Sequence, residues 1–301
     1  MDARAARELI ALNNRFYEEN AASFSATRSA PWQGWGRCLD VARCELGFDA
    51  GASTGRGSGD AAERLSTLRV LDVACGNLRF EDFLAHEIPN VACECFAVDS
   101  CATLADAGER EGESSGVPVV RFRELDVLAL LVDALEGAGA ASAKVDQLAR
   151  TLAGAFDVPP CDLAVCFGFM HHIPVRGWRM AVLRALVECL RPGGVVCVSF
   201  WRFLDDERLA RKADEATVRA AGDMRLAQIV RAFNQGDCLL GWQDRQDSFR
   251  YCHHFSDAEI DALAASVAGR ARAIARFRAD GRSGDLNEYV VLQVQERLSG
   301  D

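Results

Sequence analysis

Apolar positions recur along the chain with two spacings, and the two kinds of segment alternate. Short apolar runs are typical of strands buried in a sheet, and they predict strands at 69–74, 92–98, 118–125, 162–167 and 195–200. Segments with apolar residues at every third or fourth position predict helices between them, at 80–87, up to about 111, at 127–154 and at 178–190. Strands that alternate with helices form a parallel sheet covered on both faces, so the pattern predicts a doubly wound α/β core.

The segments that flank this core complete the predicted fold. Two helices are expected in the first fifty residues, on either side of Pro31, and further helices at 203–235 and 256–268. Two late apolar runs, 271–279 and 287–294, are joined by a turn at 280–284 and predict an antiparallel hairpin. The expected fold is α/β, with a doubly wound, mostly parallel seven-stranded sheet, a C-terminal antiparallel hairpin and a helical cap.

Glycine-rich positions divide these elements. The Gly/Ser/Asp stretch at 49–60 is predicted to be a mobile linker within the domain. Gly137 and Gly139 are expected to interrupt one helix, and the turn Arg191–Gly194 to end another. We expect a single domain over the whole chain, with an N-terminal helical cap at 1–46, a cofactor-binding core at 67–200, a cap insertion at 203–255 and a final helix and hairpin at 256–295.

Composition narrows the class of protein. Half of the 301 residues are hydrophobic, which excludes global disorder. No apolar run approaches the ~18 residues that cross a bilayer, and the N-terminus lacks the apolar centre of a secretory signal, so we expect a cytoplasmic protein without a membrane partner. The net charge of −10 does not favour a polyanion. Basic residues between Arg208 and Arg231 are interspersed with acids, and a solvated helix face is the preferred interpretation.

The twelve cysteines do not indicate a disulfide scaffold. Several of them lie inside or beside apolar runs, where a thiol behaves as a small hydrophobic group. The sequence has no CxxC pair, and the pair Cys93 and Cys95 lacks the second ligand pair that zinc requires. We expect reduced, packed cysteines and no metal site.

The strongest local motif is Leu71–Asn77, which reads LDVACGN. A strand that ends near an acid and passes through small residues into a helix lets the backbone approach a ligand closely, and the helix N-terminus adds free N–H groups. Asp99 ends the second strand, 23 residues after Gly76, where an acid is suited to bind both hydroxyls of a ribose. Asp126 follows the third strand and is suited to the amino group of an adenine.

The glycine pattern distinguishes two nucleoside cofactors. A dinucleotide needs a GxGxxG turn for its pyrophosphate, whereas here only Gly76 is glycine, with Ala74 and Leu78 on either side. S-adenosylmethionine (SAM) has no phosphate and does not need that cradle, so SAM is favoured over a dinucleotide. A sheet without any ligand is a weaker alternative. Leu78 is expected to place a bulky side chain near the methionine moiety.

From Leu71 to about Phe200 the sequence resembles the class I SAM-dependent methyltransferases. The resemblance is carried by LDVACGN, by the acid of FAVDS, by Phe167–Ile173 and by Leu190–Gly194. It implies a Rossmann-like fold with SAM bound at the carboxyl ends of the first four strands. The cofactor-binding residues are then expected to be Asp72, Ala74, Gly76, Asn77, Asp99, Ser100, Asp126, Val127 and Phe167.

The two ends of the chain resemble a narrower family, the tRNA wobble-uridine carboxymethyl methyltransferases. Ala22–Arg28 with Pro31 and Trp32 is similar to that family's opening, and Asp237–Trp242 followed by Arg250–Phe255 is similar to a later motif. Bacterial methyltransferases share the same opening. Two departures from the family pattern are Gly241, in place of a proline, and Cys252, in place of a tyrosine. The resemblance implies that Arg28 binds the carboxylate of SAM.

Two kinds of methyl acceptor require different catalytic residues. Methyl transfer is an in-line displacement, for which orientation alone contributes ~7 kcal/mol or more. A carboxylate acceptor needs no base, and Arg250 is suited to position it through bidentate hydrogen bonds. A hydroxyl or amine acceptor needs a base, for which His171, His172 and His253 are candidates, with His171 preferred to His172. A structural role in capping the turn after the fourth strand stays open for both adjacent histidines.

The sequence therefore predicts a SAM-dependent methyltransferase. By resemblance, its acceptor is an oxygen such as the carboxymethyl group of a modified wobble uridine in tRNA. The alternatives are a small-molecule O- or N-methyltransferase, and a catalytically silent subunit with the same fold. A small activating subunit is a further candidate partner, and the oligomeric state is left open.

Overall fold

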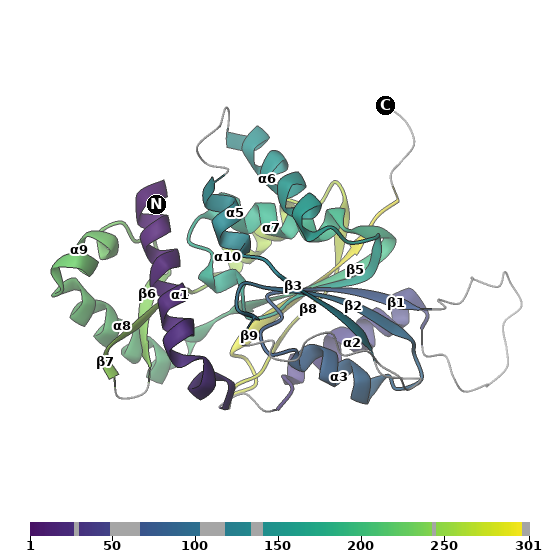
Figure 1. Ribbon diagram of the computed structural model, residues 1–301, viewed down its shortest axis with the longest axis horizontal. Coiled ribbons are helices and arrows are strands. Elements are labelled where there is room, and N and C mark those ends of the chain that lie inside the picture. The colour runs from purple at the N-terminus through teal and green to yellow at the C-terminus, as the bar shows by residue number, and fades with distance from the viewer. Residues whose placement is uncertain (27–29, 49–66, 103–117, 134–140, 243–244, 297–301) are drawn as a thin grey trace, which may run out of the picture.

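The computed structural model describes residues 1–26, 30–48, 67–102, 118–133, 141–242 and 245–296 (Figure 1). The expected linker at 49–60, the predicted helix end near 111, the two glycines at 137 and 139, and Arg28 lie outside these ranges. No helix in the described ranges has the combination of length and apolarity that a membrane crossing requires.

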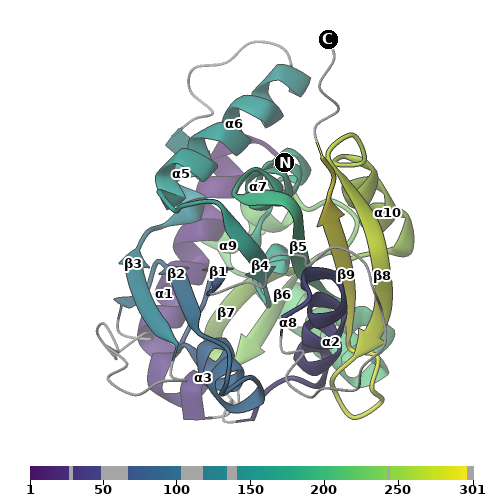
Figure 2. The ribbon, with the colours of Figure 1, turned by 90° about the vertical axis from the view of Figure 1, so that its right-hand side faces the viewer.

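A seven-stranded sheet forms the centre of the molecule (Figures 1 and 2). Its strands are β1 (Leu68–Val73), β2 (Cys93–Asp99), β3 (Val119–Glu124), β4 (Cys161–Cys166), β5 (Leu190–Trp201), β8 (Ala271–Ala279) and β9 (Asn287–Val294). They are arranged in the order β3-β2-β1-β4-β5-β9-β8, in which β1 to β5 are parallel and β9 is antiparallel to both β5 and β8. The predicted sheet and its antiparallel hairpin are confirmed. The chain reverses direction across the sheet between β1 and β4, and a crevice is expected at the carboxyl ends of these strands.

Helices cover both faces of the sheet, as Figures 1 and 2 show. One face carries α5 (Val127–Asp133), α6 (Ala141–Phe156), α7 (Arg176–Glu188) and α10 (Asp257–Ala265); the other carries α2 (Gln33–Leu46) and α3 (Arg79–Glu87). Successive strand residues point to opposite faces. In β1, Leu71 and Val73 accordingly pack into the first layer, and Leu68 and Val70 into the second.

A cap lies beside the sheet, on the left in Figure 1. It contains α1 (Ala3–Ala26), α8 (Glu207–Ala221), α9 (Met224–Val230) and a two-stranded antiparallel sheet of β6 (Asp237–Trp242) and β7 (Arg245–His253). Its own apolar cluster packs Leu9 of α1 against Leu239 of β6 and Phe249 of β7. The helices expected at 203–235 are present as α8 and α9, whereas β6 and β7 were not among the predicted elements. These strands bury polar side chains such as Arg250 and His253, so their sequence lacks the apolar alternation that signals a strand.

The turn expected at Arg191–Gly194 is incorporated into strand β5. Helix α7 ends at Glu188, and β5 begins at Leu190, which pairs with Cys161 of β4. The register then shifts and resumes with Leu163 opposite Val195. The extra residues form an irregularity of the bulge type at the start of the strand, and Gly193 takes a φ of 81° there.

Candidate active site

The turn after β1 places three residues in the left-handed backbone region. Ala74, Gly76 and Leu78 have φ values of 65°, 59° and 59°. The N–H groups of Ala74 and Cys75 donate to the Val98 carbonyl at 2.7 and 3.1 Å, which ties the turn to β2. Glycine adopts this conformation without the steric cost that other residues incur. The turn thereby places the Gly76 backbone beside the end of β2.

Asp99 ends β2 and holds this turn in place. Its Oδ2 accepts a hydrogen bond from the Gly76 N–H at 2.9 Å, and its Oδ1 accepts one from the Cys101 N–H at 2.9 Å. Burial raises the pKa of Asp99, and the backbone N–H donors partly offset that rise. A carboxylate has about four acceptor positions. Asp99 therefore keeps the capacity to accept hydrogen bonds from a pair of hydroxyls.

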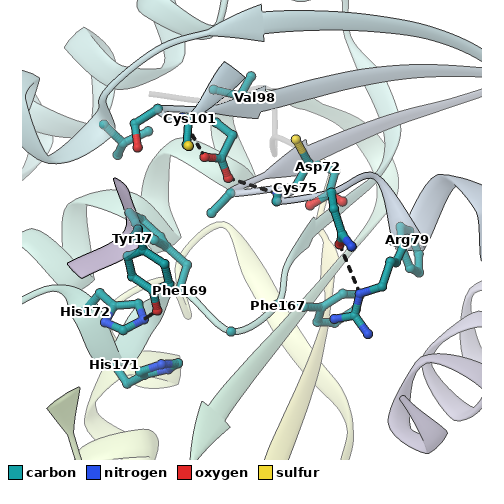
Figure 3. A pocket seen from close by; sticks show the side chains of 18 of the residues that line it. Tyr17, Asp72, Cys75, Arg79, Val98, Cys101, Phe167, Phe169, His171 and His172 are labelled. Carbon is teal, nitrogen blue, oxygen red and sulfur yellow. Dashed lines mark hydrogen bonds between the residues drawn. The ribbon is translucent and has the colours of Figure 1, made fainter. Parts of the chain in front are cut away.

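A cavity of about 520 Å³ lies at the carboxyl ends of the central strands (Figure 3). This volume lies in the range of small-molecule sites. The lining includes every described residue that the sequence predicted to bind the cofactor, together with the candidate base His171: Asp72, Ala74, Gly76, Asn77, Asp99, Ser100, Asp126, Val127 and Phe167. Leu78 is not part of the lining. It is 1% exposed and packs into the core between the sheet and α3, so the expectation that it lies near the methionine moiety was wrong.

Asp126 connects the cap to the core. Its Oδ1 accepts hydrogen bonds from the N–H groups of Leu128 and Ala129, both at 2.9 Å, and so caps the first turn of α5. Its Oδ2 accepts a hydrogen bond from the Asn14 side chain of α1 at 3.3 Å. Asp126 therefore has a structural role in addition to its position in the cavity lining.

Asp72 is accompanied by a second buried carboxyl group, that of Glu81 on α3. Each residue is 3% exposed. Burial raises the pKa of Asp72 well above its ordinary range, and the neighbouring Glu81 raises it further. The low-dielectric surroundings and the neighbouring carboxyl group both favour the protonated form of Asp72. Glu81 was not predicted from the sequence, because an acid in the first turn of a helix is common.

Arg79 is the one arginine or lysine among the described residues of the lining. Its Nε donates to Asn77 Oδ1 at 3.1 Å, and its Nη1 donates to the Ala30 carbonyl at 2.9 Å. The guanidinium lies 5.3 Å from the ring centre of Trp35 and 5.8 Å from that of Trp32. Burial lowers the pKa of Arg79. Arg79 was not among the predicted site residues, although it lies only two positions after Asn77, the last residue of the LDVACGN motif.

The opposite wall of the cavity is formed by α1 and by the short helix η2 (Met170–His172), as Figure 3 shows. The Tyr17 hydroxyl lies 2.8 Å from His172 Nε2. The His171 ring packs against His172 and Trp201, with ring centres 4.0 and 4.9 Å apart. Asn13 lies one helical turn before Tyr17 and also lines the cavity. A polar Asn13 on the otherwise apolar face of the first helix was the sequence signal for this wall.

The structure places Arg250 and His253 outside the cavity lining. Arg250 is buried behind Tyr17, and its Nη1 donates to the Tyr17 hydroxyl at 3.5 Å. The two ring nitrogens of His253 lie 2.7 Å from Asp237 Oδ1 and 2.8 Å from Glu259 Oε2. Their predicted catalytic roles stay predictions. The geometry brings His171, but not these two residues, into contact with the cavity.

Among the described residues, His171, His172 and Cys252 have potential metal-ligating atoms within 4.8 Å of one another, and all three are buried. His172 has protein partners at both ring nitrogens, Tyr17 on one side and the Tyr251 carbonyl on the other. The hydrogen bonds of His172 account for its position in this cluster, and we assign no metal to the three residues.

No protein-family model matches the sequence, and no curated protein matches it. Solved structures share its fold. 1,6-Didemethyltoxoflavin-N1-methyltransferase from Burkholderia thailandensis, solved with 1,6-didemethyltoxoflavin and S-adenosylhomocysteine, is 14% identical, with a TM-score of 0.51 over 97% of this chain and 91% of that chain. A SAM-dependent methyltransferase from Clostridium acetobutylicum is 10% identical, with a TM-score of 0.48 over 94% and 99% of the two chains. The likeness to the Burkholderia enzyme confirms the Rossmann-like methyltransferase fold.

Proposed function

We propose that this protein is a SAM-dependent methyltransferase that binds SAM in the cavity at the carboxyl ends of the central strands. The observation that carries the proposal is Asp99, which two backbone N–H groups hold at the cavity with acceptor capacity left for the two hydroxyls of a ribose. SAM, when bound, supplies a methyl group on a cationic sulfur. The methyltransferase fold supports the same assignment.

Residues on either side of Asp99 suit the other two parts of SAM. Asp126 and Val127 line the cavity after β3, where the sequence predicted the adenine. Arg79 lines it after the glycine turn and offers a guanidinium to the methionine carboxylate, the role that the sequence assigned to Arg28. A dinucleotide is less well supported, because its pyrophosphate turn needs several glycines and Gly76 is the one glycine between Ala74 and Leu78. An intact set of binding residues argues against a catalytically silent subunit.

For the acceptor, the charge of the cavity favours a neutral hydroxyl or amine on a small molecule. Among the described residues, the lining contains one arginine and five acids, namely Glu18, Asp72, Asp99, Asp126 and Asp280. Arg250, which the sequence assigned to a carboxylate acceptor, contacts Tyr17 from behind the lining. The carboxymethyl group of a tRNA wobble uridine is the second candidate, supported by the sequence resemblance alone. Mass spectrometry of tRNA nucleosides from a deletion strain distinguishes the two, because loss of a methylated wobble uridine supports the second.

Calorimetric titration with SAM and with S-adenosylhomocysteine (SAH) tests the proposed function. Both ligands are expected to bind, and Asp99→Asn is expected to raise their dissociation constants about 10- to 100-fold, because a charged hydrogen-bond acceptor contributes about 1.5–3 kcal/mol. Glu94→Gln is the matched control on the same strand, since Glu94 pairs with Arg121 outside the cavity. Absence of binding to the folded protein, or equal affinity in Asp99→Asn, contradicts the proposal.

A further inference from the structure

A polar network of residues far apart in the sequence meets at the Tyr17 hydroxyl, on the cavity wall opposite the cofactor turn (Figure 3). Tyr17 comes from α1, its partner His172 from η2 and its second partner Arg250 from β7. The hydroxyl oxygen lies 2.8 Å from His172 Nε2 and 3.5 Å from Arg250 Nη1. Tyr17 and His172 both line the cavity, whereas Arg250 does not. Because the ring nitrogens of His172 contact the Tyr17 hydroxyl and the Tyr251 carbonyl, the phenol is the group of this pair that we expect to contact an acceptor.

The surroundings of His172 allow either neutral tautomer. Its Nδ1 lies 3.2 Å from the Tyr251 carbonyl oxygen, which accepts a hydrogen bond, and 3.2 Å from Asn13 Nδ2, which donates one. The Asn13 amide is oriented by Tyr251, whose N–H donates to Asn13 Oδ1 at 2.7 Å. His172 Nδ1 therefore has a partner whether or not it carries the proton. Nε2 is correspondingly able to accept a proton from Tyr17 or to donate one to it.

Arg250 places a positive charge beside the same phenol. It lies 5.3 to 5.8 Å from the ring centres of Phe16, Trp201 and Trp242, and these rings shield the charge from water. Burial alone would lower the pKa of Arg250, but its electrostatic interactions with Cys252 and with Tyr17 raise it overall. The attraction is reciprocal, so the guanidinium favours the ionised form of the Tyr17 phenol.

We propose that Tyr17 is the residue that accepts the proton of a neutral hydroxyl or amine acceptor during methyl transfer, with His172 as its proton acceptor and Arg250 as a positioning residue. The proposal rests on the proposed function. The acceptor's lone pair forms the new bond to the methyl carbon, the carbon–sulfur bond breaks, and its electron pair stays on sulfur. The acceptor's proton passes to Tyr17 Oη as the hydroxyl proton passes to His172 Nε2, leaving an imidazolium that later releases its proton to solvent.

The groups packed around the phenol fit this assignment. His172 and Arg250 contact the Tyr17 hydroxyl, and the other titratable groups nearby are His171 and Cys252, which cluster with His172, and Glu18, which lines the cavity next to Tyr17 in α1. His171, the base that the sequence favoured, lines the cavity and packs at a tilt against the rings of His172 and Trp201, with interplanar angles of 51° and 58°. Among these groups, Tyr17 has both a surface on the cavity and a paired proton acceptor behind it.

The chain offers a spectroscopic test, because it contains three tyrosines. The other two are buried against carboxylates: Tyr251 donates to Asp237 at 2.6 Å, and Tyr289 donates to Asp280 at 2.5 Å. Burial and these acids raise the pKa of both residues. Ultraviolet titration of the folded protein is therefore expected to report the ionisation of Tyr17 alone. Tyr17→Phe should abolish the signal, and Tyr289→Phe, the matched control, should retain it.

SAM and SAH provide a matched pair of probes, because they differ by a methyl group and the positive charge on sulfur. If Tyr17 faces the reacting centre, the ionisation midpoint with SAM should lie about one pH unit or more below that with SAH, since an opposite charge within about 6 Å has an effect of this size. Arg250→Gln should move the midpoint to higher pH, and Arg250→Lys should restore much of the difference. His172→Gln is the second variant if substitutions at Arg250 do not fold, and it should also change the midpoint.

The outcomes separate the two proposals. Binding of both ligands with a lower midpoint for SAM supports Tyr17 as the proton acceptor. Binding of both ligands with the same midpoint, or an ionisation signal that survives Tyr17→Phe, overturns the assignment of Tyr17 and leaves the proposed function intact. A folded protein that binds neither SAM nor SAH overturns the proposed function itself.

Discussion

Two residues in the cofactor turn show how one strained conformation has different consequences at different positions. Ala74 and Leu78 both have left-handed φ values, which cost about 1–2 kcal/mol for a residue with a Cβ. Leu78 offsets this cost because its side chain is buried in the core against α3. The smaller side chain of Ala74 lies at the edge of the cavity and offsets little.

Glycine substitutions at these two positions should therefore have opposite effects. Ala74→Gly should raise the free energy of unfolding by up to about 1 kcal/mol, because relief of strain exceeds the roughly 0.5–1 kcal/mol that glycine's flexibility costs. Leu78→Gly should lower it by about 2 kcal/mol or more, because loss of a buried leucine costs ~2–5 kcal/mol. Urea unfolding at neutral pH measures both changes. A loss of stability in Ala74→Gly contradicts the strain argument.

At the residue scale, the sequence predicted acids that the structure places in the cavity lining, because each one ends or follows a strand. Asp99 and Asp126 lie at positions that a parallel sheet brings to one edge, and both line the cavity. Tyr17 was not identified, because its contact with His172 joins positions 155 residues apart and depends on how α1 packs on the sheet. Arg250 was identified by resemblance, but its place behind Tyr17 is a property of the folded chain.

At the scale of elements, a network of polar side chains connects the cap to the core. His253 on β7 bridges Asp237 of β6 and Glu259 of α10, and Arg179 of α7 forms an ion pair with Glu259. The Tyr251 hydroxyl donates to the same Asp237 oxygen. This polar network therefore links α7 and α10, which cover the sheet, to the two-stranded sheet of the cap.

These contacts of His253 predict that the stability of the folded protein depends on pH. Burial alone would raise the pKa of Asp237 and of Glu259, but hydrogen bonds from His253 and other donors lower both overall. A carboxyl with a lowered pKa stabilises the folded state above its ordinary value of about 4, and this contribution is lost as the pH falls through the folded-state value. His253→Gln should lower the free energy of unfolding by about 3 kcal/mol at pH 7, because it removes the shared partner of the buried Asp237 carboxylate and the partly buried Glu259 carboxylate.

Urea unfolding of the parent and of His253→Gln at several pH values tests the link. The difference between the two proteins should shrink as the pH falls below about 4, because protonation removes the same interactions in the parent. His86→Gln is the matched control, since His86 lies on the surface of α3 with its side chain 86% exposed, and it should change little at any pH. A difference that stays constant with pH would show that His253 stabilises the cap by packing alone.

The same elements explain which parts of the fold the sequence predicted. The central strands are buried on both faces, so their apolar runs are continuous and easily recognised. Strands β6 and β7 are stabilised by cross-strand hydrogen bonds and by the polar network through Asp237 and His253. Their residues have no apolar period, and their pairing depends on contacts with α1 and α10 that sequence periodicity does not contain.

At the scale of the whole molecule, the cavity lies where the cap meets the sheet. The cofactor turn and Asp99 come from the sheet, whereas Asn13, Asn14 and Tyr17 come from α1 of the cap. In the proposed function, the sheet therefore supplies the residues for SAM and the cap supplies those for the acceptor. The hydrogen bond between Asn14 and Asp126 joins these layers at the cavity itself.

The distribution of the twelve cysteines over the molecule gives a further test. All twelve are free thiols, and all but Cys44, Cys101 and Cys238 are buried. Thiol reagents attack the thiolate, and burial raises the pKa of the partly exposed Cys238 to about 12. Cys44 is exposed on α2, and Cys101 lines the cavity beside Asp99. Only Cys44 and Cys101 combine access to solvent with a position at which a reagent is expected to react.

Iodoacetamide labelling of the native protein near pH 8, followed by peptide mass spectrometry, should modify Cys44 first and Cys101 next. SAH should slow the labelling of Cys101 and leave that of Cys44 unchanged, because only Cys101 lies in the proposed cofactor cavity. Cys44→Ser should remove the labelling at position 44 without altering that of Cys101. If SAH slowed the labelling of both Cys44 and Cys101, it would be acting through the stability of the whole protein and not by covering Cys101 in the cavity.

In denaturant without reductant, all twelve thiols should react with the reagent. A count of eight or fewer reactive thiols would contradict the prediction of reduced cysteines.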